Sequence, residues 1–270
     1  MARKLVIVGA GLIGASFARG IRDRFESIVA LEPDDDRARF VVEEGIVDDR
    51  VIRVPDAADA VLIACPSDRI ADWLVALADH QGTIFDTGSV KGSIISDVVS
   101  RLGFLPENFV PTHPIAGLER SGPQASDAAL FRDRMVIVTP IASTDPGRKQ
   151  RVVDWWRSIG ANVEEMDPEE HDAVYALTSH LPHLLAFTYL QGISSENLAH
   201  TGGGFKDFSR IGGSDPEMWA AIFDRNRQAL LAALDGFESD LKIFRTAIES
   251  ADLETCLDLI RRARKLRQEI

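Results

Sequence analysis

The sequence feature that most constrains the fold is the apolar run Leu5-Val6-Ile7-Val8, which leads directly into a glycine-rich turn. A short β-branched run of this kind is typical of a strand buried on both faces. The turn fits the pattern G-x-G-x-x-G, and a helical pattern follows it. Its glycines would form the tight turn, admit a pyrophosphate and let helix and strand pack closely, while the helix N-terminus would bind the phosphates. We therefore predict a dinucleotide-binding fold with these residues against the cofactor: Gly9, Gly11, Leu12, Ile13 and Gly14.

An acidic residue stands where a dinucleotide-binding fold needs one. A second apolar run, Ile28-Val29-Ala30-Leu31, is followed directly by Glu32. In such folds an acidic side chain about 20 residues after the glycines binds a ribose 2′-hydroxyl. Three more carboxylates, Asp34 to Asp36, follow, and together these charges would repel a 2′-phosphate. We therefore expect NAD rather than NADP, with Glu32 as the selecting residue.

From Lys4 to about Met166 strand-like and helix-like segments alternate, which predicts a mostly parallel, doubly wound sheet of the Rossmann type. After the first two strands the pattern favours a weak third strand near Val51–Val54 and a fourth over Ala60–Ala64. Further strands are expected over residues 83–86, 109–111, 135–139 and 162–166, and helices over residues 34–44, 67–78, 92–101 and 146–158.

A different organisation begins at Asp167-Pro168-Glu169-Glu170, where a capping residue, a proline at the first helical position and first-turn acids start a helix. Beyond this point the sequence shows no convincing strand pattern. Helices are expected over residues 168–194, 215–234, about 235–250 and 252–268, with a glycine-rich break at Gly202–Gly204. We therefore predict an α/β Rossmann-type domain at residues 1–166 and an all-helical domain at residues 167–270.

The charge of the chain argues against two classes of partner. The formal net charge is −12, so the basic excess of a nucleic-acid-binding protein is missing, and an acidic surface does not favour anionic membranes. No apolar run approaches the length of a membrane span. Because Met1 stands just before the first strand, we expect no signal or transit peptide and a cytoplasmic location.

Candidate site residues follow the predicted strands, because ligands bind outside the carboxyl ends of the strands in an open α/β sheet. Pro66 and Ser67 follow one strand and are expected beside the cofactor, Ser89 follows a second and His113 a third. A hydroxyl and an imidazole would thus meet beside the nicotinamide, where a histidine can take the proton of an alcohol as hydride leaves. Considered alone, Ser89 is better explained as a turn or cap residue than as a catalytic one. His113 alone is explained equally well as a buried structural histidine or as a base.

The helical half adds further candidates. Ser179-His180-Leu181-Pro182-His183 places two histidines three residues apart on one face of a helix that the proline would kink. They could form a metal pair, but no third ligand at a recognisable spacing supports a metal site. Arg210 follows Gly202–Gly204, whose backbone could come close to a ligand, although a surface salt bridge would explain a single arginine as well. Trp219 could simply belong to the core.

Several motifs together resemble the prephenate and arogenate dehydrogenases of tyrosine biosynthesis. They are GAGLIG, DTGSVKG, THPIAGLERSG, SHLPH and GGFKDFSRIGGSDPEMW, in this order over nearly the whole chain, and the last three together are highly specific. The resemblance implies that His113 is the base for the ring hydroxyl, that Ser89 supports it and that Arg210 binds a substrate carboxylate. It also implies a pocket lined by further residues: Ser179, His183, Glu119, Gly203 and Trp219.

The resemblance also implies the reaction. Hydride would pass from the hydroxyl-bearing ring carbon of prephenate to NAD, His113 would take the hydroxyl proton, and the ring carboxylate would leave as CO₂. Aromatisation drives this loss, so neither a metal nor a Schiff base is expected. Arogenate, whose side chain carries an ammonium group, is the alternative substrate. We expect prephenate to be preferred, because neither Asp207 nor Glu119 is clearly an unpaired acid that could bind the ammonium.

The helical domain is expected to form a homodimer, with Trp219 approaching the site of the partner subunit as the resemblance implies. Its apolar positions are expected to exceed what a thin helical layer could bury: Trp219, Ile222, Leu230, Leu234 and Phe237. Because the sequence stops at Ile270, we expect no control by tyrosine through a C-terminal regulatory domain. Two other functions remain open: a β-hydroxyacid dehydrogenase, which shares the fold plan, and a non-catalytic module that senses NAD.

Overall fold

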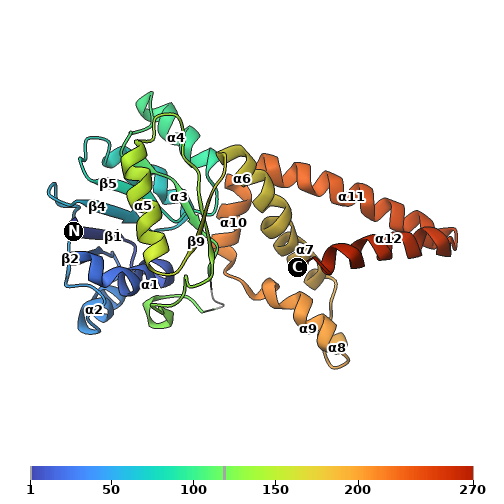
Figure 1. Cartoon of the computed structure of the whole chain (residues 1–270). Helices are drawn as coiled ribbons and strands as arrows, with labels where there is room; N and C mark the ends of the chain where they lie inside the picture. The colour runs from blue at the N-terminus through green and yellow to red at the C-terminus, as the bar shows by residue number, and fades with distance from the viewer. Residues whose placement is uncertain (1, 118–119, 270) are drawn as a thin grey trace.

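The computed structural model describes residues 2–117 and 120–269, in which a sheet-containing part is followed by a helical part (Figure 1). Six parallel strands form the main sheet in the order β3-β2-β1-β4-β5-β6. Their bounds are β1 (Ala2–Val8), β2 (Phe25–Leu31), β3 (Asp49–Arg50), β4 (Ala60–Ile63), β5 (Thr83–Asp86) and β6 (Phe109–Val110). The strand order reverses between β1 and β4, so a ligand-binding crevice is expected at the carboxyl ends of these two strands.

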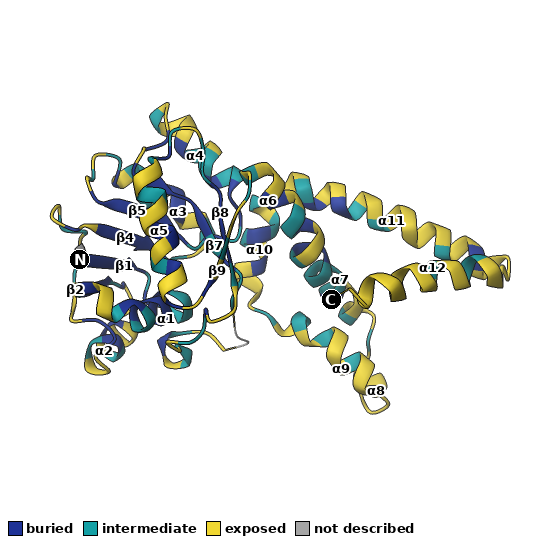
Figure 2. Ribbon diagram, in the orientation of Figure 1, coloured by how far each residue is buried: buried dark blue, intermediate teal, exposed yellow. Residues whose placement is uncertain are grey.

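Helices cover both faces of this sheet, as the doubly wound prediction requires. Alternate residues of β1 point to opposite faces: Leu5 and Ile7 join one buried cluster, and Val6 and Val8 join another. The central strands β1, β4 and β5 are accordingly dark in Figure 2. The helices of this part are α1 (Leu12–Ile21), α2 (Asp35–Glu43), α3 (Ser67–Ala76), α4 (Gly92–Leu102) and α5 (Pro146–Ser158).

The last predicted strands do not join the main sheet. They form a second sheet in which β7 (Thr112–Pro114) pairs antiparallel with β8 (Met135–Val138), and β8 pairs parallel with β9 (Asn162–Glu165). The segment predicted as one strand over residues 109–111 divides at Pro111, where the chain passes from β6 to the second sheet. Proline has no N–H to continue the ladder, and its carbonyl accepts a hydrogen bond from the Thr139 amide instead.

The third strand lies earlier than the sequence pattern indicated, at Asp49–Arg50 rather than at residues 51–54. Tertiary contacts set its position. The Asp48 carboxylate accepts a hydrogen bond from the Ile28 amide (2.7 Å) and forms an ion pair with Arg22 (2.9 Å). These bonds place Asp49 and Arg50, rather than residues 51–54, beside β2.

The helical part consists of α6 (Pro168–Tyr175), a π-helical turn (Ala176–His180), α7 (Leu181–Gln191), α8 (Ser195–Leu198), α9 (Gly203–Ser209), α10 (Pro216–Arg225), α11 (Arg227–Glu249) and α12 (Leu253–Arg267). The short helices α8 and α9 were not predicted. The break expected between residues 234 and 235 lies instead at Asn226, whose side chain is used in long-range hydrogen bonds described below. None of the described helices has both the length and the apolar character needed to cross a bilayer.

The apolar residues expected to form a subunit interface are mostly buried within this chain. Trp219 and Ile222 pack against Val90 of the sheet-containing part, and Leu230 packs against α6, the π-helical turn and α7 through a small cluster. Many of the exposed apolar residues of the helical part lie on the hairpin of α11 and α12, which projects from the molecule (Figures 1 and 2). They include Leu241, Ile243, Ile248, Leu253, Leu257 and Ile260.

Two neighbouring glycines of the turn after β1 should respond oppositely to substitution by alanine. A Cβ at Gly14 would lie 2.2 Å from the Gly9 carbonyl oxygen and 2.9 Å from Cγ2 of Ile7, whereas a Cβ at Gly11 would meet nothing within 4 Å. We expect Gly14→Ala to lower the free energy of unfolding by about 1–3 kcal/mol through overpacking. Gly11→Ala should change it by less than about 0.5 kcal/mol. Urea unfolding measures both, and equal losses would contradict the packing argument.

Candidate active site

The turn after β1 forms an anion-binding cradle at the N-terminus of α1. Gly9 adopts a positive φ of 92° and its amide donates a hydrogen bond to the Leu31 carbonyl (3.0 Å), which closes the turn against β2. The first intrahelical bond of α1 runs from the Ala15 amide to the Gly11 carbonyl, so the N–H groups of Leu12, Ile13 and Gly14 have no helical acceptor. The open space beside Gly11 leaves room for a phosphate to approach these donors. The predicted cofactor residues therefore fit a dinucleotide.

Glu32 lies at the carboxyl end of β2, next to this cradle, as predicted. Its side chain is 5% exposed, and its two oxygens accept hydrogen bonds from the amides of Ala10 (2.8 Å) and Asp34 (3.1 Å). Each carboxylate oxygen has a second lone pair, so a ribose hydroxyl could also donate to it. Glu32 thus stabilises the glycine turn, and its selection of NAD over NADP stays a prediction.

The loops after β4 and β5 meet beside the glycine turn. The hydroxyl of Ser67, at the start of α3 after Pro66, accepts a hydrogen bond from the Ser89 amide (3.4 Å). A Cβ at Gly9 would lie 2.7 Å from the Ala64 carbonyl oxygen. Pro66, Ser67 and Ser89 are therefore brought together at the carboxyl edge of the sheet.

A buried ion pair joins the loop after β5 to β7. The Lys91 ammonium lies 2.5 Å from the Asp86 carboxylate and donates a second hydrogen bond to the Thr112 carbonyl (2.7 Å). The other Asp86 oxygen accepts from the Thr112 amide (2.9 Å). Burial lowers the pKa of Lys91 below its ordinary value, although the charge of Asp86 acts in the opposite direction. These bonds fix the backbone that carries Ser89 relative to the backbone that carries His113.

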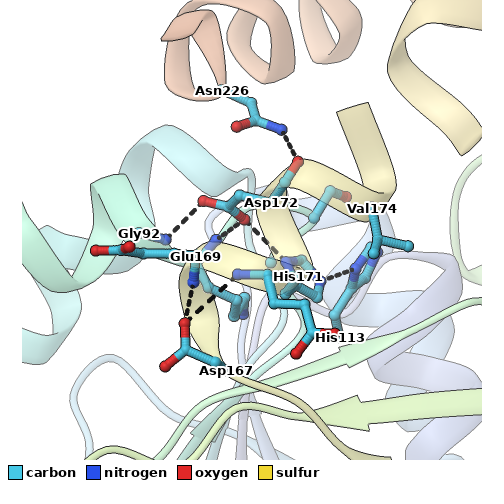
Figure 3. Close-up of polar contacts among 12 residues, drawn as sticks. Gly92, His113, Asp167, Glu169, His171, Asp172, Val174 and Asn226 are labelled. Atoms are coloured by element: carbon cyan, nitrogen blue, oxygen red, sulfur yellow. Dashed lines mark hydrogen bonds and ion pairs between the residues drawn. The ribbon is translucent and has the colours of Figure 1, made fainter. Parts of the chain in front are cut away.

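His113, the predicted base, contacts a second histidine that the sequence analysis did not single out. Its Nδ1 lies 2.8 Å from Nε2 of His171 on α6, and Nδ1 of His171 lies 2.8 Å from the Asp172 carboxylate (Figure 3). The Tyr175 ring packs edge-on against His113 with a centroid distance of 4.9 Å. Burial lowers the pKa of His113 well below 6.5, and the neighbouring His171, Lys91 and His180 lower it further. His113 is therefore neutral, and able to accept a proton, at neutral pH.

A group of side chains at the start of the helical part surrounds the predicted substrate residues. The imidazole of His183 stacks on the Trp219 ring with centroids 3.6 Å apart, and its Nδ1 donates a hydrogen bond to the Ser179 carbonyl (2.8 Å) in the π-helical turn. Burial lowers the pKa of His183, and the positive charge of Arg210 lowers it as well. The turn that begins at Arg210 packs against α7, the helix that carries His183. Such π-helical turns are common at functional sites. Four predicted residues, Ser179, His183, Arg210 and Trp219, therefore lie together.

The approach of Trp219 to the site of a partner subunit stays a prediction, and within its own chain the residue is well packed. It is only 6% exposed and packs between His183 and Val90 of its own chain. Gly203 begins α9 at an exposed position and takes no part in the contacts described around His113 and His183. Glu119 lies outside the described residues. Among the residues that are described, no group of three or more His, Cys, Asp or Glu side chains is arranged to hold a metal ion.

The residues missed by the sequence analysis are Lys91, Asp86, His171, Asp172 and Asn226. Lys91 was part of a quoted motif, but nothing in that motif shows that its ammonium is buried. His171 lies 58 positions after His113, and only the packing of α6 against the sheet brings them together.

The fold and this site define a dinucleotide-binding oxidoreductase in which a neutral imidazole can accept a proton. Residues 17–165 match the family model of the prephenate dehydrogenase nucleotide-binding domain, and residues 167–262 match that of its dimerization domain. The chain therefore belongs to the prephenate dehydrogenase family.

Individual relatives span nearly the whole chain. A cyclohexadienyl dehydrogenase of Zymomonas mobilis is 36% identical, over 98% of this chain and 95% of the relative. A prephenate dehydrogenase of A. aeolicus, crystallised with hydroxyphenyl propionate and NAD⁺, is 33% identical with a TM-score of 0.90, over 100% of this chain and 98% of that chain. An arogenate dehydrogenase of Synechocystis is 25% identical with a TM-score of 0.84, over 98% of this chain and 99% of that chain.

Glu32 should decide between NAD and NADP. We expect Glu32→Gln to weaken NAD binding about ten- to a hundredfold, which corresponds to a lost charged hydrogen bond of about 1.5–3 kcal/mol, and to raise the affinity for NADP relative to NAD. Quenching of the protein's tryptophan fluorescence on titration with each cofactor measures both affinities. Glu43→Gln removes the same charge from an exposed position on α2 and should change neither affinity. A wild-type protein that prefers NADP would contradict the assignment.

Proposed function

We propose that this protein catalyses the NAD-dependent oxidative decarboxylation of prephenate to 4-hydroxyphenylpyruvate, a step of tyrosine biosynthesis. The observation that carries the proposal is the neutral His113 at the carboxyl edge of a dinucleotide-binding sheet, with Arg210 and His183 in the adjoining helical part. Membership of the prephenate dehydrogenase family supports the same reaction.

Each part of the site would have one task. NAD, when bound, would supply the hydride acceptor. His113 would take the proton of the ring hydroxyl as the C–H bond breaks, and Ser89 would hydrogen-bond the same hydroxyl. The guanidinium of Arg210 would bind a substrate carboxylate through its planar fork of donors. The ring carboxylate leaves as CO₂ with its bonding electrons passing into the aromatic ring, so the residues present need only position the substrate and accept one proton.

Prephenate and arogenate share the carboxylates, so Arg210 cannot distinguish them. An acid beside the side-chain α-carbon would favour the ammonium of arogenate. Asp207 on α9 is exposed, and we assign it no such role. We therefore propose prephenate as the better substrate, with some activity on arogenate. The alternative, a preference for arogenate, has support in the similarity to the Synechocystis arogenate dehydrogenase.

The proposed reaction is tested by incubating the purified protein with NAD and each substrate while following NADH absorbance. We expect kcat/KM for prephenate to exceed that for arogenate, and Arg210→Ala to raise KM for both by about ten- to a hundredfold, as for a lost charged hydrogen bond of about 1.5–3 kcal/mol. If neither substrate yields NADH, the proposed function is wrong. A tenfold preference for arogenate would reverse the substrate assignment only.

His113→Asn should keep NAD binding and lower kcat about 10²- to 10⁴-fold, the usual contribution of a positioned general base. Because the pKa of His113 is lowered, the wild-type kcat should stay constant from pH 8 down to below 6.5 and fall only in more acidic solution, where the imidazole protonates. Stopped-flow measurement of NADH formation across this range checks both expectations. The exposed His200→Asn is the matched control, and a normal kcat for His113→Asn would show that His113 is structural.

We further propose that the protein is a homodimer through its helical part. The match to a dimerization domain supports this, and so do the exposed apolar side chains of α11 and α12, since patches of this kind mark association surfaces. The division of the chain at residues 166 and 167 and the cytoplasmic location stay predictions.

Light scattering at micromolar concentration should give a mass near twice 29.6 kDa. Ile260→Asp, which places a charge on the exposed apolar face of α12, should shift the protein toward monomer. Ile52→Asp is the matched control, because Ile52 is 93% exposed in the loop after β3, and it should leave the mass unchanged. A wild-type monomer would refute the proposed dimer.

A further inference from the structure

The contacts of His113 form a chain of three side chains that ends at a carboxylate. The chain runs from His113 on β7 through His171 to Asp172, both on α6, with two steps of 2.8 Å (Figure 3). We propose that His171 and Asp172 are positioning residues that keep the proton of neutral His113 on Nδ1, so that Nε2 is free to accept the substrate proton. That Nε2 accepts a proton from the substrate rests on the proposed function, whereas the tautomer of His113 does not depend on it.

The direction of the hydrogen bonds follows from the carboxylate. An ionised Asp172 can only accept, so Nδ1 of His171 must carry the proton between them. In neutral His171 the other nitrogen, Nε2, is then a bare acceptor. The contact of 2.8 Å between this Nε2 and Nδ1 of His113 therefore needs a proton on His113 Nδ1. Neutral His113 has one ring proton, so its Nε2 carries a lone pair.

The opposite arrangement would need His171 to be a cation that donates to both neighbours. His171 is fully buried, and burial lowers its pKa below 6.5 even though the hydrogen bond to Asp172 raises it. The nearby positive charge of Lys91 lowers it as well. A neutral His171 is therefore the form present at neutral pH.

Donors from the sheet-containing part stabilise the charge of Asp172. The Lys91 amide donates to one carboxylate oxygen (2.9 Å) and the Gly92 amide to the other (2.8 Å), at the N-terminus of α4. Helix N-termini favour negative charge. The Asp172 carbonyl accepts from the side chain of Asn226 (2.9 Å) at the break between α10 and α11. Asp172 is thus bound from both sides, which fixes α6, and with it His171, relative to His113.

The three hydrogen-bonded side chains also lie next to the positive charge that forms on His113 during the reaction. When Nε2 of His113 binds the substrate proton, the resulting imidazolium donates its Nδ1–H to His171, one ring away from the Asp172 anion. The titratable groups around the two histidines come from β5, the loop after it, α6 and the π-helical turn: Asp86, Lys91, Asp172, Tyr175 and His180.

The tautomer can be measured without substrate. In protein labelled with ¹⁵N at histidine, two-bond ¹H–¹⁵N spectra at neutral pH distinguish a protonated Nδ1 from a protonated Nε2. The signals of His113 are those missing from His113→Asn. We expect wild-type His113 to be protonated at Nδ1, and protonation at Nε2 would overturn the proposal. This result stands even if the protein oxidises neither prephenate nor arogenate, an outcome that would refute only the proposed function.

Two substitutions of His171 separate positioning from simple packing. His171→Phe keeps a ring but removes the acceptor for His113, whereas the amide oxygen of His171→Gln can still accept from Nδ1. We expect His171→Phe to lower kcat by about 10- to 1,000-fold, less than the loss of the base itself, with the KM for prephenate and the affinity for NAD nearly unchanged. His171→Gln should recover most of kcat, and the exposed His200→Phe should have no effect.

The pH profile adds a readout that a packing role would not move. Loss of the acceptor in His171→Phe should let part of His113 adopt the Nε2–H tautomer, visible in the ¹⁵N spectra. In His171→Phe the acidic limb of the kcat–pH profile should shift relative to the wild type. In His171→Gln this limb should stay close to its wild-type position. Equal losses of kcat in the Phe and Gln variants, or a normal kcat in His171→Phe, would overturn the positioning role.

Discussion

A carboxylate in a protein interior needs donors for its lone pairs, because burying an unpaired charge is costly. Asp172 satisfies this requirement with the amides of Lys91 and Gly92 from one part of the chain and with the ring of its neighbour His171 from the other. The two bonds from the Lys91 and Gly92 amides set the position of α6 against α4, and the bond within α6 orients the ring of His171. The polar network that stabilises the junction therefore also determines which nitrogen of His113 is free.

The buried Lys91 acts on the site from the other side. Its ammonium pairs with Asp86 and donates to the carbonyl of Thr112, the residue before His113. A buried ion pair contributes little net stability when its desolvation cost is included, but it positions the two loops and its cation disfavours protonation of His113. Burial of the ring lowers the pKa of His113 most, and the charges of His171 and Lys91 lower it further, so the base stays neutral below pH 6.5.

The substrate side of the site depends on irregular helical geometry. The π-helical turn at Ala176–His180 places the Ser179 carbonyl against His183, and the stacked Trp219 packs on Val90, which follows Ser89. Asn226 joins this region to the first, because its amide donates to the Asp172 carbonyl and lies 2.9 Å from Nδ1 of His180. The region around the base and the stacked pair of His183 and Trp219 are thus packed together.

Local patterns in the sequence were sufficient for the glycine turn, for the place of Glu32 at the end of a strand and for the doubly wound sheet, because strand periodicity and turn chemistry act within a few residues. The role of His113 as the base came from the resemblance to a family and stays a prediction. Local patterns were insufficient for the third strand, for the second sheet and for the break at Asn226, where bonds from distant residues decide the outcome. The hydrogen bonds from His113 through His171 to Asp172 could not be predicted from local patterns either. These two residues are 58 and 59 positions from His113, and only the docking of α6 against the N-terminus of α4, whose amides stabilise the Asp172 carboxylate, brings them to the base.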